Sequence, residues 1–399
     1  NGISNNEKAV LLLEKRTFKE LLVDMELRNL QNNIVGQEAS RLFARAEINM
    51  GVEAFRDSLY SLLKRNTFLN IKFENMLDTL GEISRTDIRS LLGEWEKTTP
   101  LPFYSLGEPT LTKITNKGGE EFFVLKMLIS NNSDYDGIIH MDIRKDGWWY
   151  QPLEDPRAKT KIEMPAHTSK EFVSVWEDQI RNVEINTMVS GNLPNIISQD
   201  INNVKQERNK IVKDSIYILP ESSFDLPGEI IVDNEDSTLF ILSAPPIVGL
   251  LPKWLDEVEE TPFKYSGISW WRPPLQWTAT TNDRYYGKYI RSAFVIKSGD
   301  GSQTATWKVP VPEVGQYDLY YHVFKDDELR WNNNLQGEYH FKVKYGSEVE
   351  DAYVNLRKAN EGWEQLGSYY FDSDTVRVVL TDECKLRSVT ADAVKIVKR

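Results

Sequence analysis

The stretch Gly362-Trp363-Glu364-Gln365-Leu366-Gly367-Ser368-Tyr369-Tyr370-Phe371 is the most regular segment of the chain. Its apolar side chains alternate around a glycine, and a similar pattern continues in residues 376–380 and 391–397. Period-two alternation, β-branched and aromatic residues, and turn residues between the runs are typical of β-strands. The end of the chain is therefore predicted to form a β-sandwich, with Trp363 and Tyr370 expected in its core.

The size and composition of the chain limit what it can be. It has 399 residues, of which 40% are hydrophobic and 11% aromatic, so roughly two to three domains with sizeable cores are expected. The formal net charge is −12. This charge argues against nucleic acid or an anionic membrane surface as a partner, because binding phosphates requires clustered Lys and Arg. No apolar run reaches the ~18 residues of a membrane span, so no transmembrane segment is predicted.

Cysteine usage and the first residues give further expectations. Cys384 is the only cysteine, which excludes an intrachain disulfide and a Cys-based zinc site. The sequence opens on Asn1-Gly2-Ile3-Ser4, without Met or a signal peptide, and enters helical sequence at once. We therefore expect this chain to be a piece of a longer protein, in which the preceding part could hold the catalytic chemistry.

Residues 1–100 are predicted to form a helical segment. Apolar residues recur at helical spacing in four runs, of which Val52, Phe55, Leu59 and Leu62 are an example, with charges between them. Pro100 and the proline two residues later end the helical pattern. Short loops between these runs favour an antiparallel bundle.

From residue 101 the apolar period changes to two, and residues 101–245 are predicted to form an immunoglobulin-like β-sandwich. Residues 122–129 and 138–143 are predicted to pair across a turn at Asp136-Gly137. Residues 229–232 and 239–242 are assigned to the same sandwich, and the polar interval 198–214 is expected to be a loop or an exposed helix. Residues 246–262 are predicted to be a linker, and residues 263–399 a second β domain. The fold class is thus multidomain, α followed by all-β.

The sequence contains no convincing catalytic motif. None of its four histidines stands in a His-Glu-x-x-His arrangement, and no Gly-x-Ser-x-Gly elbow or phosphate-binding loop occurs. His322 and His340 are expected to be hydrogen-bonded residues within strands. The acidic run 233–236 could offer oxygen ligands to calcium, but it lacks the full EF-hand pattern, so a turn is predicted instead. The chain is predicted to be no enzyme, with no catalytic residue, no metal site and no cofactor, although paired-carboxylate chemistry stays open.

Aromatic residues are the one unusual class. Exposed Trp and Tyr can stack on sugar rings while nearby Arg and Asn satisfy the hydroxyls. Residues 148–150 form one aromatic group, and Trp307 is expected in the core of its sandwich. The alternative for the loop aromatics is packing between domains. The candidate ligand-binding residues are Trp270, Trp271, Trp277, Arg284, Tyr285, Arg330 and Trp331.

Several motifs in the last third resemble one family. They are Tyr286-Gly287, residues 304–307, Gly315-Gln316-Tyr317, the opening stretch 362–371 and residues 391–397. In order and spacing they resemble the golvesin C-terminal-like, or xanthan-lyase carbohydrate-binding-like, domain. The resemblance implies a jelly-roll-like β-sandwich that serves as an accessory module on exported bacterial enzymes, with carbohydrate as the inferred ligand.

Residues 40–245 resemble another family more faintly. Gly51 to Leu59, Phe73 to Leu80, Thr86 to Trp95 and Leu101-Pro102 look like the helical end of a gluzincin (M1-type) aminopeptidase that leads into a β-sandwich. In that family the zinc ligands and the general-base Glu lie upstream, and none of those motifs is present here. The resemblance implies an architecture without its zinc site.

These observations predict the non-catalytic C-terminal region of an exported bacterial protein, whether periplasmic, cell-surface or secreted. It would bind a polysaccharide or cell-envelope polymer and support an upstream peptidase-like catalytic domain of the same polypeptide, to which any zinc would belong. Two alternatives stay open. The chain could complete the cleft of an active zinc aminopeptidase, or it could be a protein-interaction scaffold that binds no glycan.

Overall fold

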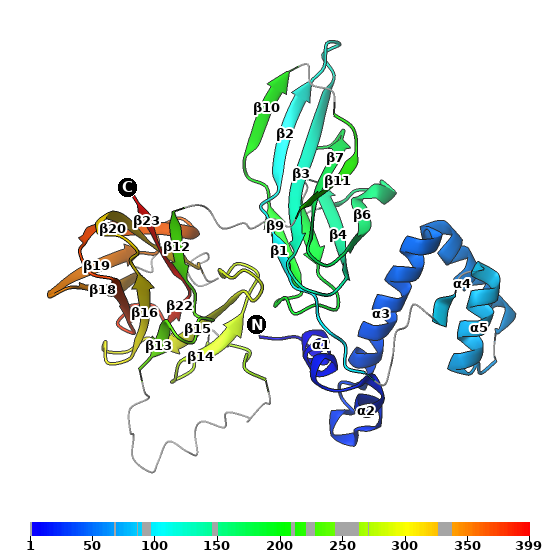
Figure 1. Cartoon of the computed structure of the whole chain (residues 1–399), viewed down its shortest axis with the longest axis horizontal. Coiled ribbons are helices and arrows are strands. Elements are labelled where there is room, and N and C mark those ends of the chain that lie inside the picture. The colour runs from blue at the N-terminus through cyan, green and yellow to red at the C-terminus, as the bar shows by residue number, and fades with distance from the viewer. Residues whose placement is uncertain are drawn as a thin grey trace. The chain divides into compact units, whose positions relative to one another are not determined.

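The structure is a computed structural model that describes residues 2–67, 69–85, 87–89, 97–145, 151–208, 212–220, 228–243, 263–269, 271–325 and 337–399. The chain divides into two compact units, one formed by residues 4–224 and the other by residues 225–399 together with residues 1–3. Helices come first along the chain and antiparallel sheets follow (Figure 1), which confirms the predicted fold class. No helix in the described ranges is both long and apolar enough to span a membrane.

The helices begin at well-capped residues. Ser4 and Glu7 form a capping box at the first helix, and Thr17 and Glu20 form another at the second, so orphan backbone N–H groups are satisfied. Gly51 ends the third helix with a φ of 83°, a value that favours glycine. The helices are α1 (Asn5–Lys15), α2 (Phe18–Val23), α3 (Gln31–Met50), α4 (Val52–Arg65) and α5 (Phe73–Ser84), with a short 3-10 turn η1 (Met25–Leu27).

The helices bury two small cores. Leu13, Leu21 and Ile34 are fully buried where α1, α2 and α3 meet. A second group, which includes Phe55 and Leu77, joins α3, α4 and α5. This apolar spacing agrees with the helical periods in the sequence.

The first sandwich has two sheets that enclose one core. The first sheet has the order β10-β2-β3-β7-β11, with β1 also on β3, and the second has the order β5-β4-β8-β9, with β6 also on β4. The strands are β1 (Tyr104–Leu106), β2 (Thr110–Thr115), β3 (Glu121–Asn131), β4 (Gly137–Lys145), β5 (Gln151–Pro152), β6 (Lys159–Met164), β7 (Thr168–Trp176), β8 (Ile180–Asn186), β9 (Ile196–Asp200), β10 (Val204–Arg208) and β11 (Ser215–Pro220).

Two expectations about this sandwich are wrong. β3 and β4 lie in different sheets, so the turn at Asp136-Gly137 joins no hairpin. The fully buried Asn131 holds the crossing, because its amide donates to the carbonyls of Tyr135 and Met164, each at 2.8 Å. The interval 198–214 contains β10 and the end of β9. An edge strand needs no apolar alternation when both its faces meet water, and so the polar sequence of β10 did not indicate a strand.

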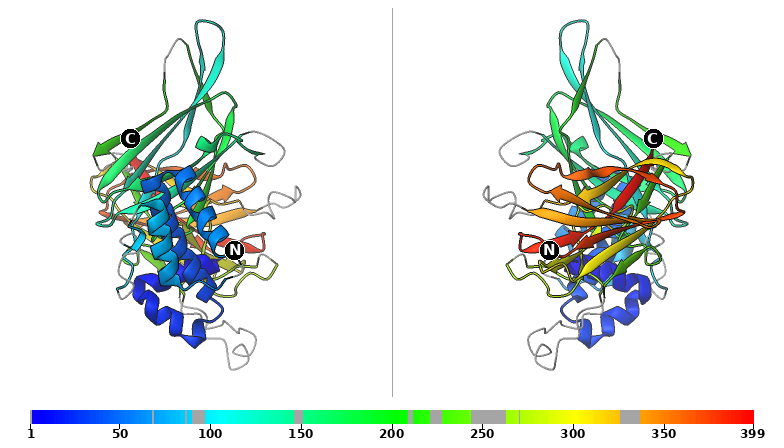
Figure 2. Two further views of the ribbon diagram at one scale, coloured as in Figure 1. Left: turned by 90° about the vertical axis from the view of Figure 1, so that its right-hand side faces the viewer. Right: turned by 90° about the vertical axis from the view of Figure 1, so that its left-hand side faces the viewer.

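The C-terminal sandwich contains three sheets around a large aromatic core, and its yellow-to-red strands can be followed in Figure 2. Trp307 is fully buried in this core, as predicted. The sheets have the orders β12-β23-β17-β20, β13-β16-β21-β18-β19 and β14-β15-β22. The strands are β12 (Glu229–Val232), β13 (Phe240–Leu242), β14 (Thr278–Thr281), β15 (Ser292–Lys297), β16 (Thr304–Pro310), β17 (Gly315–Val323), β18 (Glu338–Tyr345), β19 (Glu348–Asn355), β20 (Gly362–Phe371), β21 (Thr375–Thr381), β22 (Ser388–Ala391) and β23 (Val394–Lys398).

β12 and β13 correct the assignment of residues 229–242 to the first sandwich. β12 pairs with β23 and β13 pairs with β16, so both belong to the C-terminal sandwich. Phe240 is buried with its ring 5.3 Å from Trp307 and 5.5 Å from Phe294. The sequence of a short strand indicates its conformation but not the strand with which it pairs. The prolines after residue 244 suggested a domain boundary at that point. The predicted linker 246–262 lies outside the described residues, and the chain on both its sides belongs to the same unit.

Candidate functional site

A β-bulge in β20 decides which side chains face outward on the sheet β12-β23-β17-β20. Leu319 of β17 lies opposite Gly367, whereas the next residue of β17 lies opposite Gln365, so Leu366 has no counterpart. The extra residue reverses the alternation, because side chains on a strand change face at every residue. Trp363 therefore lies opposite His322 on the outer face of the sheet.

The bulge overturns the expected core position of Trp363. Without it, Trp363 would point inward with Tyr369 and Phe371, which are buried. Trp363 is instead half-buried at the surface. The expectation for Tyr370 is also wrong, since this residue is 60% exposed between two inward-pointing neighbours.

Four side chains gather on this outer face, and we call them the Trp363 cluster: Tyr286, His322, Trp363 and Lys395. The ring of Trp363 lies 5.1 Å from the rings of both Tyr286 and His322, in tilted and edge-on arrangements. The ammonium group of Lys395 lies 4.9 Å from the centre of the Trp363 ring, within the range of a cation–π contact. Tyr286 comes from the loop after β14, and the other three residues come from strands β17, β20 and β23.

A buried carboxylate orients this cluster from below. Asp392 is fully buried, and its Oδ2 lies 2.8 Å from Nδ1 of His322. The backbone N–H of Tyr286 donates to both carboxylate oxygens at 3.2 Å. Burial raises the pKa of Asp392, and the neighbouring His322 opposes that rise. With Nδ1 of His322 engaged by the carboxylate of Asp392, Nε2 is the ring nitrogen left for an outside partner.

The cations around the cluster have acidic partners. Lys395 lies 2.8 Å from Glu229 of β12, and the two side chains are only 12% and 18% exposed. Arg284 lies 3.0 Å from Glu361 and donates to the carbonyl of Lys325 at the same distance. The charges of Lys395 and Arg284 are thus balanced by Glu229 and Glu361.

The structure brings two of the candidate residues together and separates others. Arg284 and Tyr285 both lie against Phe324, at 4.5 Å and 4.6 Å, and Tyr285 is buried. Trp271 is 65% exposed and lies beside Arg387 at 4.9 Å. Trp277 packs against the sandwich core, and its buried indole N–H has no hydrogen-bond partner among the described residues.

Three of the candidates, Trp270, Arg330 and Trp331, lie outside the described residues, as do the aromatics at 148–150. Tyr286 and Lys395 were missed as candidates although both stand in motifs of the resemblance. The signal that could have found them is cross-strand register, which no single stretch of sequence contains.

The remaining histidine and metal expectations can be compared with the structure. His340 is a hydrogen-bonded strand residue, as expected, with Nε2 2.7 Å from Asp351 and Nδ1 3.3 Å from Glu383. In the described ranges no group of three or more His, Cys, Asp or Glu side chains is arranged to hold a metal ion.

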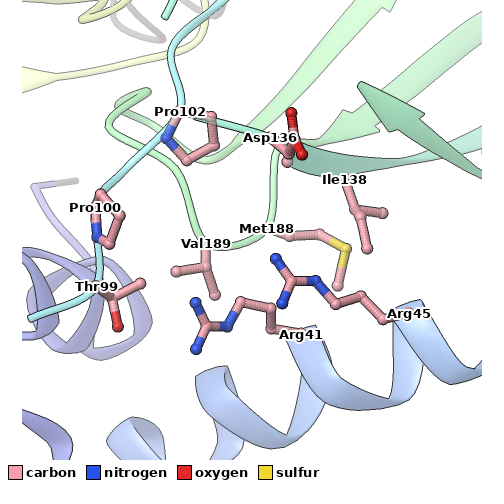
Figure 3. Close-up of a pocket in the computed structure, with 10 residues that line it drawn as sticks. Arg41, Arg45, Thr99, Pro100, Pro102, Asp136, Ile138, Met188 and Val189 are labelled. Carbon is pink, nitrogen blue, oxygen red and sulfur yellow. The ribbon is translucent and has the colours of Figure 1, made fainter. Parts of the chain in front are cut away.

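A cavity in the first unit lies between α3 and the loops of the first sandwich (Figure 3). The guanidinium groups of Arg41 and Arg45 point into it from successive turns of α3, while the carboxylate of Asp136 is turned away from them. Burial lowers the pKa of Arg45, and the charge of Arg41 adds to this effect. The space amounts to about 20 Å³. This volume accommodates about one water molecule. A hollow of about 180 Å³ shares Arg45, Asp136 and Ile138 with it.

A larger hollow of about 490 Å³ lies at one end of the first sandwich. Trp176 lines it, with the guanidinium of Arg157 5.0 Å from its ring. Arg157 also contacts Asp155 and Asp214, so its charge is already neutralised there. The hollow is also lined by Glu154 and Glu177 and by the ion pair of Lys145 with Asp178.

Comparison with known families decides the identity of the last third of the chain. Residues 273–398 match the family model of the Golvesin C-terminal domain. The match confirms the resemblance in the sequence, and such domains are non-catalytic accessory modules. It begins after β12 and β13, so the structure adds two strands that complete the sheets of this Golvesin C-terminal domain. No curated protein matches the chain.

Several solved structures show distant likeness. A β-glucuronidase from Bacteroides uniformis has 12% identity and a TM-score of 0.22, over 79% of this chain and 32% of the enzyme, so the chain spans about a third of that protein. Aminopeptidase A of Legionella pneumophila, in complex with aspartic acid, has 15% identity and a TM-score of 0.20, over 38% of this chain and 16% of the enzyme. At such TM-scores neither likeness bears on the fold or the function of this chain.

Proposed function

We propose that this chain is the non-catalytic accessory region of a longer exported bacterial protein, and that its Golvesin C-terminal domain binds a polysaccharide or cell-envelope polymer through the Trp363 cluster. The observation that supports this most strongly is the outward position of Trp363, which the bulge at Leu366 imposes. An indole ring on the outer face of a sheet, beside fixed polar groups, suits the apolar face of a sugar ring.

The polar groups around Trp363 support a glycan ligand because they are held in place before binding. Asp392 fixes the ring of His322, and its contact with the backbone of Tyr286 fixes the loop that carries the phenol ring. Preorganised groups lose little conformational freedom on binding. Nε2 of His322 can accept a hydrogen bond from a sugar hydroxyl, and the phenol of Tyr286 can donate or accept another.

Binding can be tested by electrophoresis of the full chain in gels that contain glucan, xylan, mannan or acidic polysaccharides. Trp363→Ala is expected to abolish the retardation that the wild-type chain shows in at least one gel. Trp271→Ala is the matched control, because Trp271 is an exposed tryptophan of the same domain with a different neighbour, Arg387.

The proposal fails if the folded wild-type chain is retarded in none of the gels. If Trp271→Ala removes the retardation and Trp363→Ala does not, the ligand site lies in the loops that the sequence first suggested. Circular dichroism and thermal unfolding of both variants would show that any loss of binding is not a loss of folding.

A scaffold role is the second candidate, favoured by β11. This edge strand exposes four successive apolar residues, Ile216, Tyr217, Ile218 and Leu219, at 46%, 51%, 72% and 38%. Exposed apolar edge strands pair readily with other chains. As part of the scaffold role, we propose that the chain supports an upstream peptidase-like domain. A peptidase of this kind would have a His-Glu-x-x-His motif in the gene sequence that precedes Asn1. Sedimentation of the chain with that domain, with Ile218→Lys as the variant, would test the contact.

A further inference from the structure

The outer face of the sheet β13-β16-β21-β18-β19 contains three basic residues in one row, which we call the basic row: Lys308, Arg377 and Lys344. Arg377 of β21 lies directly opposite Lys308 of β16 on one side and Lys344 of β18 on the other. Neighbouring strands are about 4.8 Å apart, so three positive residues follow one another across three strands at that spacing.

The pattern of burial establishes that the basic row faces outward. Trp307, Val343 and Val378 are fully buried, and each is the neighbour in sequence of one member of the row. Side chains alternate along a strand, so Lys308, Lys344 and Arg377 point away from the core. Lys342 lies on the same face, opposite Val379 and next to the row.

Among the described residues, the members of the basic row have no ion-pair partner, although Asp351 of β19 lies directly opposite the adjoining Lys342. Lys342 forms no ion pair in this part of the chain either. This differs from the Trp363 cluster, in which Lys395 lies against Glu229. A row of basic residues is unusual in this chain, which has more acidic residues (60) than basic residues (48).

Like charges on directly opposite residues of a sheet destabilise it. The aliphatic stems of lysine and arginine can cover apolar surface, and outward-facing Val379 is only 7% exposed beside them. Covering Val379 needs the stems but not three adjacent positive head groups. A bound polyanion would account for the head groups as well, since it would neutralise them.

An exposed aromatic ring lies on the same face as the basic row. Tyr353 of β19 is 56% exposed, and its ring is stacked on His340 at 4.8 Å with an interplanar angle of 7°. His340 is held by Asp351 at 2.7 Å, so the ring pair has a fixed orientation. One flat face thus combines a stacking surface with a line of positive charges (its hairpin β18–β19 is labelled in Figure 1).

We propose that this face binds an acidic polysaccharide, with its carboxylate groups on the basic row and a sugar ring on Tyr353. The site lies on a different sheet from the Trp363 cluster and does not depend on it. A glycan is favoured over nucleic acid because the chain as a whole is strongly acidic and repels a densely charged duplex at long range. The local row still attracts a polymer whose charges are farther apart.

The test measures binding of the full chain to polygalacturonate by affinity electrophoresis and calorimetry, with dextran and duplex DNA as the other probes. The variant combines Lys308→Gln, Arg377→Gln and Lys344→Gln. The control is Arg357→Gln, because Arg357 is a solvent-exposed arginine just beyond the far end of β19. We expect the triple variant to bind polygalacturonate about ten-fold or more weakly, with a smaller salt dependence, and the control to bind as the wild type does.

The outcomes separate this proposal from the one on the Trp363 cluster. It is overturned if the triple variant binds polygalacturonate like the wild type, if the wild type does not bind it, or if duplex DNA binds more tightly. It is supported if Trp363→Ala leaves binding of polygalacturonate intact and Tyr353→Ala weakens it. The proposal is also overturned if Trp363→Ala loses binding of polygalacturonate while the triple variant keeps it, because the acidic polymer would then bind at the Trp363 cluster.

Discussion

Replacing Asp233 by asparagine is expected to stabilise the C-terminal sandwich at pH 8 and to leave its stability nearly unchanged at pH 4. Asp233 follows β12, and burial raises its pKa to about 8, with the negative charge of Asp392 as the next cause. The backbone N–H of Asn234 donates to its Oδ1 at 2.7 Å, which only partly offsets burial. A carboxyl with this pKa keeps its proton in the folded chain over a pH range in which a free aspartate is ionised.

The magnitude follows from the difference between the folded and unfolded pKa. In the unfolded chain Asp233 ionises near its usual pKa of about 3.9, so between pH 4 and pH 8 the unfolded state releases a proton that the folded state retains. A raised pKa contributes stability that is complete below pH 4 and is lost as the pH rises to about 8. Each pH unit corresponds to about 1.36 kcal/mol, which gives an upper bound of roughly 5 kcal/mol over this window.

The assay is urea unfolding of the full chain at pH 4, 6 and 8, followed by hydrogen exchange of peptides from β17 and β23. Asp233→Asn keeps an acceptor for the N–H of Asn234 but cannot ionise. Asp236→Asn is the matched control, because Asp236 accepts from Thr238 in a turn a few residues away. The reasoning is refuted if wild type and Asp233→Asn lose stability equally between pH 4 and pH 8.

Three further results are expected. Phe240→Ala removes a ring that packs on Trp307, so it is expected to destabilise the C-terminal sandwich by about 3–5 kcal/mol. Amide hydrogen exchange in the first sandwich is expected to stay unchanged. Faster hydrogen exchange in the first sandwich would contradict the placement of β13 in the C-terminal one. Gly137→Ala places a methyl group against the hydroxyl of Tyr104 and is expected to cost about 1–3 kcal/mol in urea unfolding. Combination with Tyr104→Phe is expected to recover part of this loss, and the absence of any recovery would mean that the backbone causes it. Arg377→Gln removes the repulsion between Arg377 and its two lysine neighbours, so it is expected to raise the midpoint of unfolding above that of the wild type at low salt. In 1 M salt this difference is expected to disappear. A difference between variant and wild type that does not depend on salt would argue against local repulsion.

The sequence predicted most of the secondary structure and the class of the fold. The helices before Pro100 and the strands after it follow from local periods of hydrophobicity, which burial on one face enforces. The motif residues of the last third also identify the Golvesin C-terminal domain without any structure. Such features depend on neighbours within a few residues, and so a single stretch of sequence records them.

Partners in space are a different kind of information. β12 and β13 had clear strand patterns, yet only pairing with β23 and β16 assigns them to the C-terminal sandwich. The sequence of β20 predicts that Trp363 continues the inward alternation, and only the register against β17 reveals the extra residue at Leu366. A bulge changes no composition and little periodicity, but it turns every side chain beyond it to the other face.

The positions of the charged residues likewise separate what the sequence shows from what the tertiary structure shows. The net charge of −12 is a property of the sequence, and it argued against nucleic acid or an anionic membrane surface as a partner. Lys308, Lys344 and Arg377 are far apart in sequence, and three adjacent strands bring them together on one face. The sequence by itself determined most of the helices and strands and the family to which the last domain is similar. The tertiary structure alone decided which side chains share a surface, because register and sheet order join residues that local sequence cannot relate.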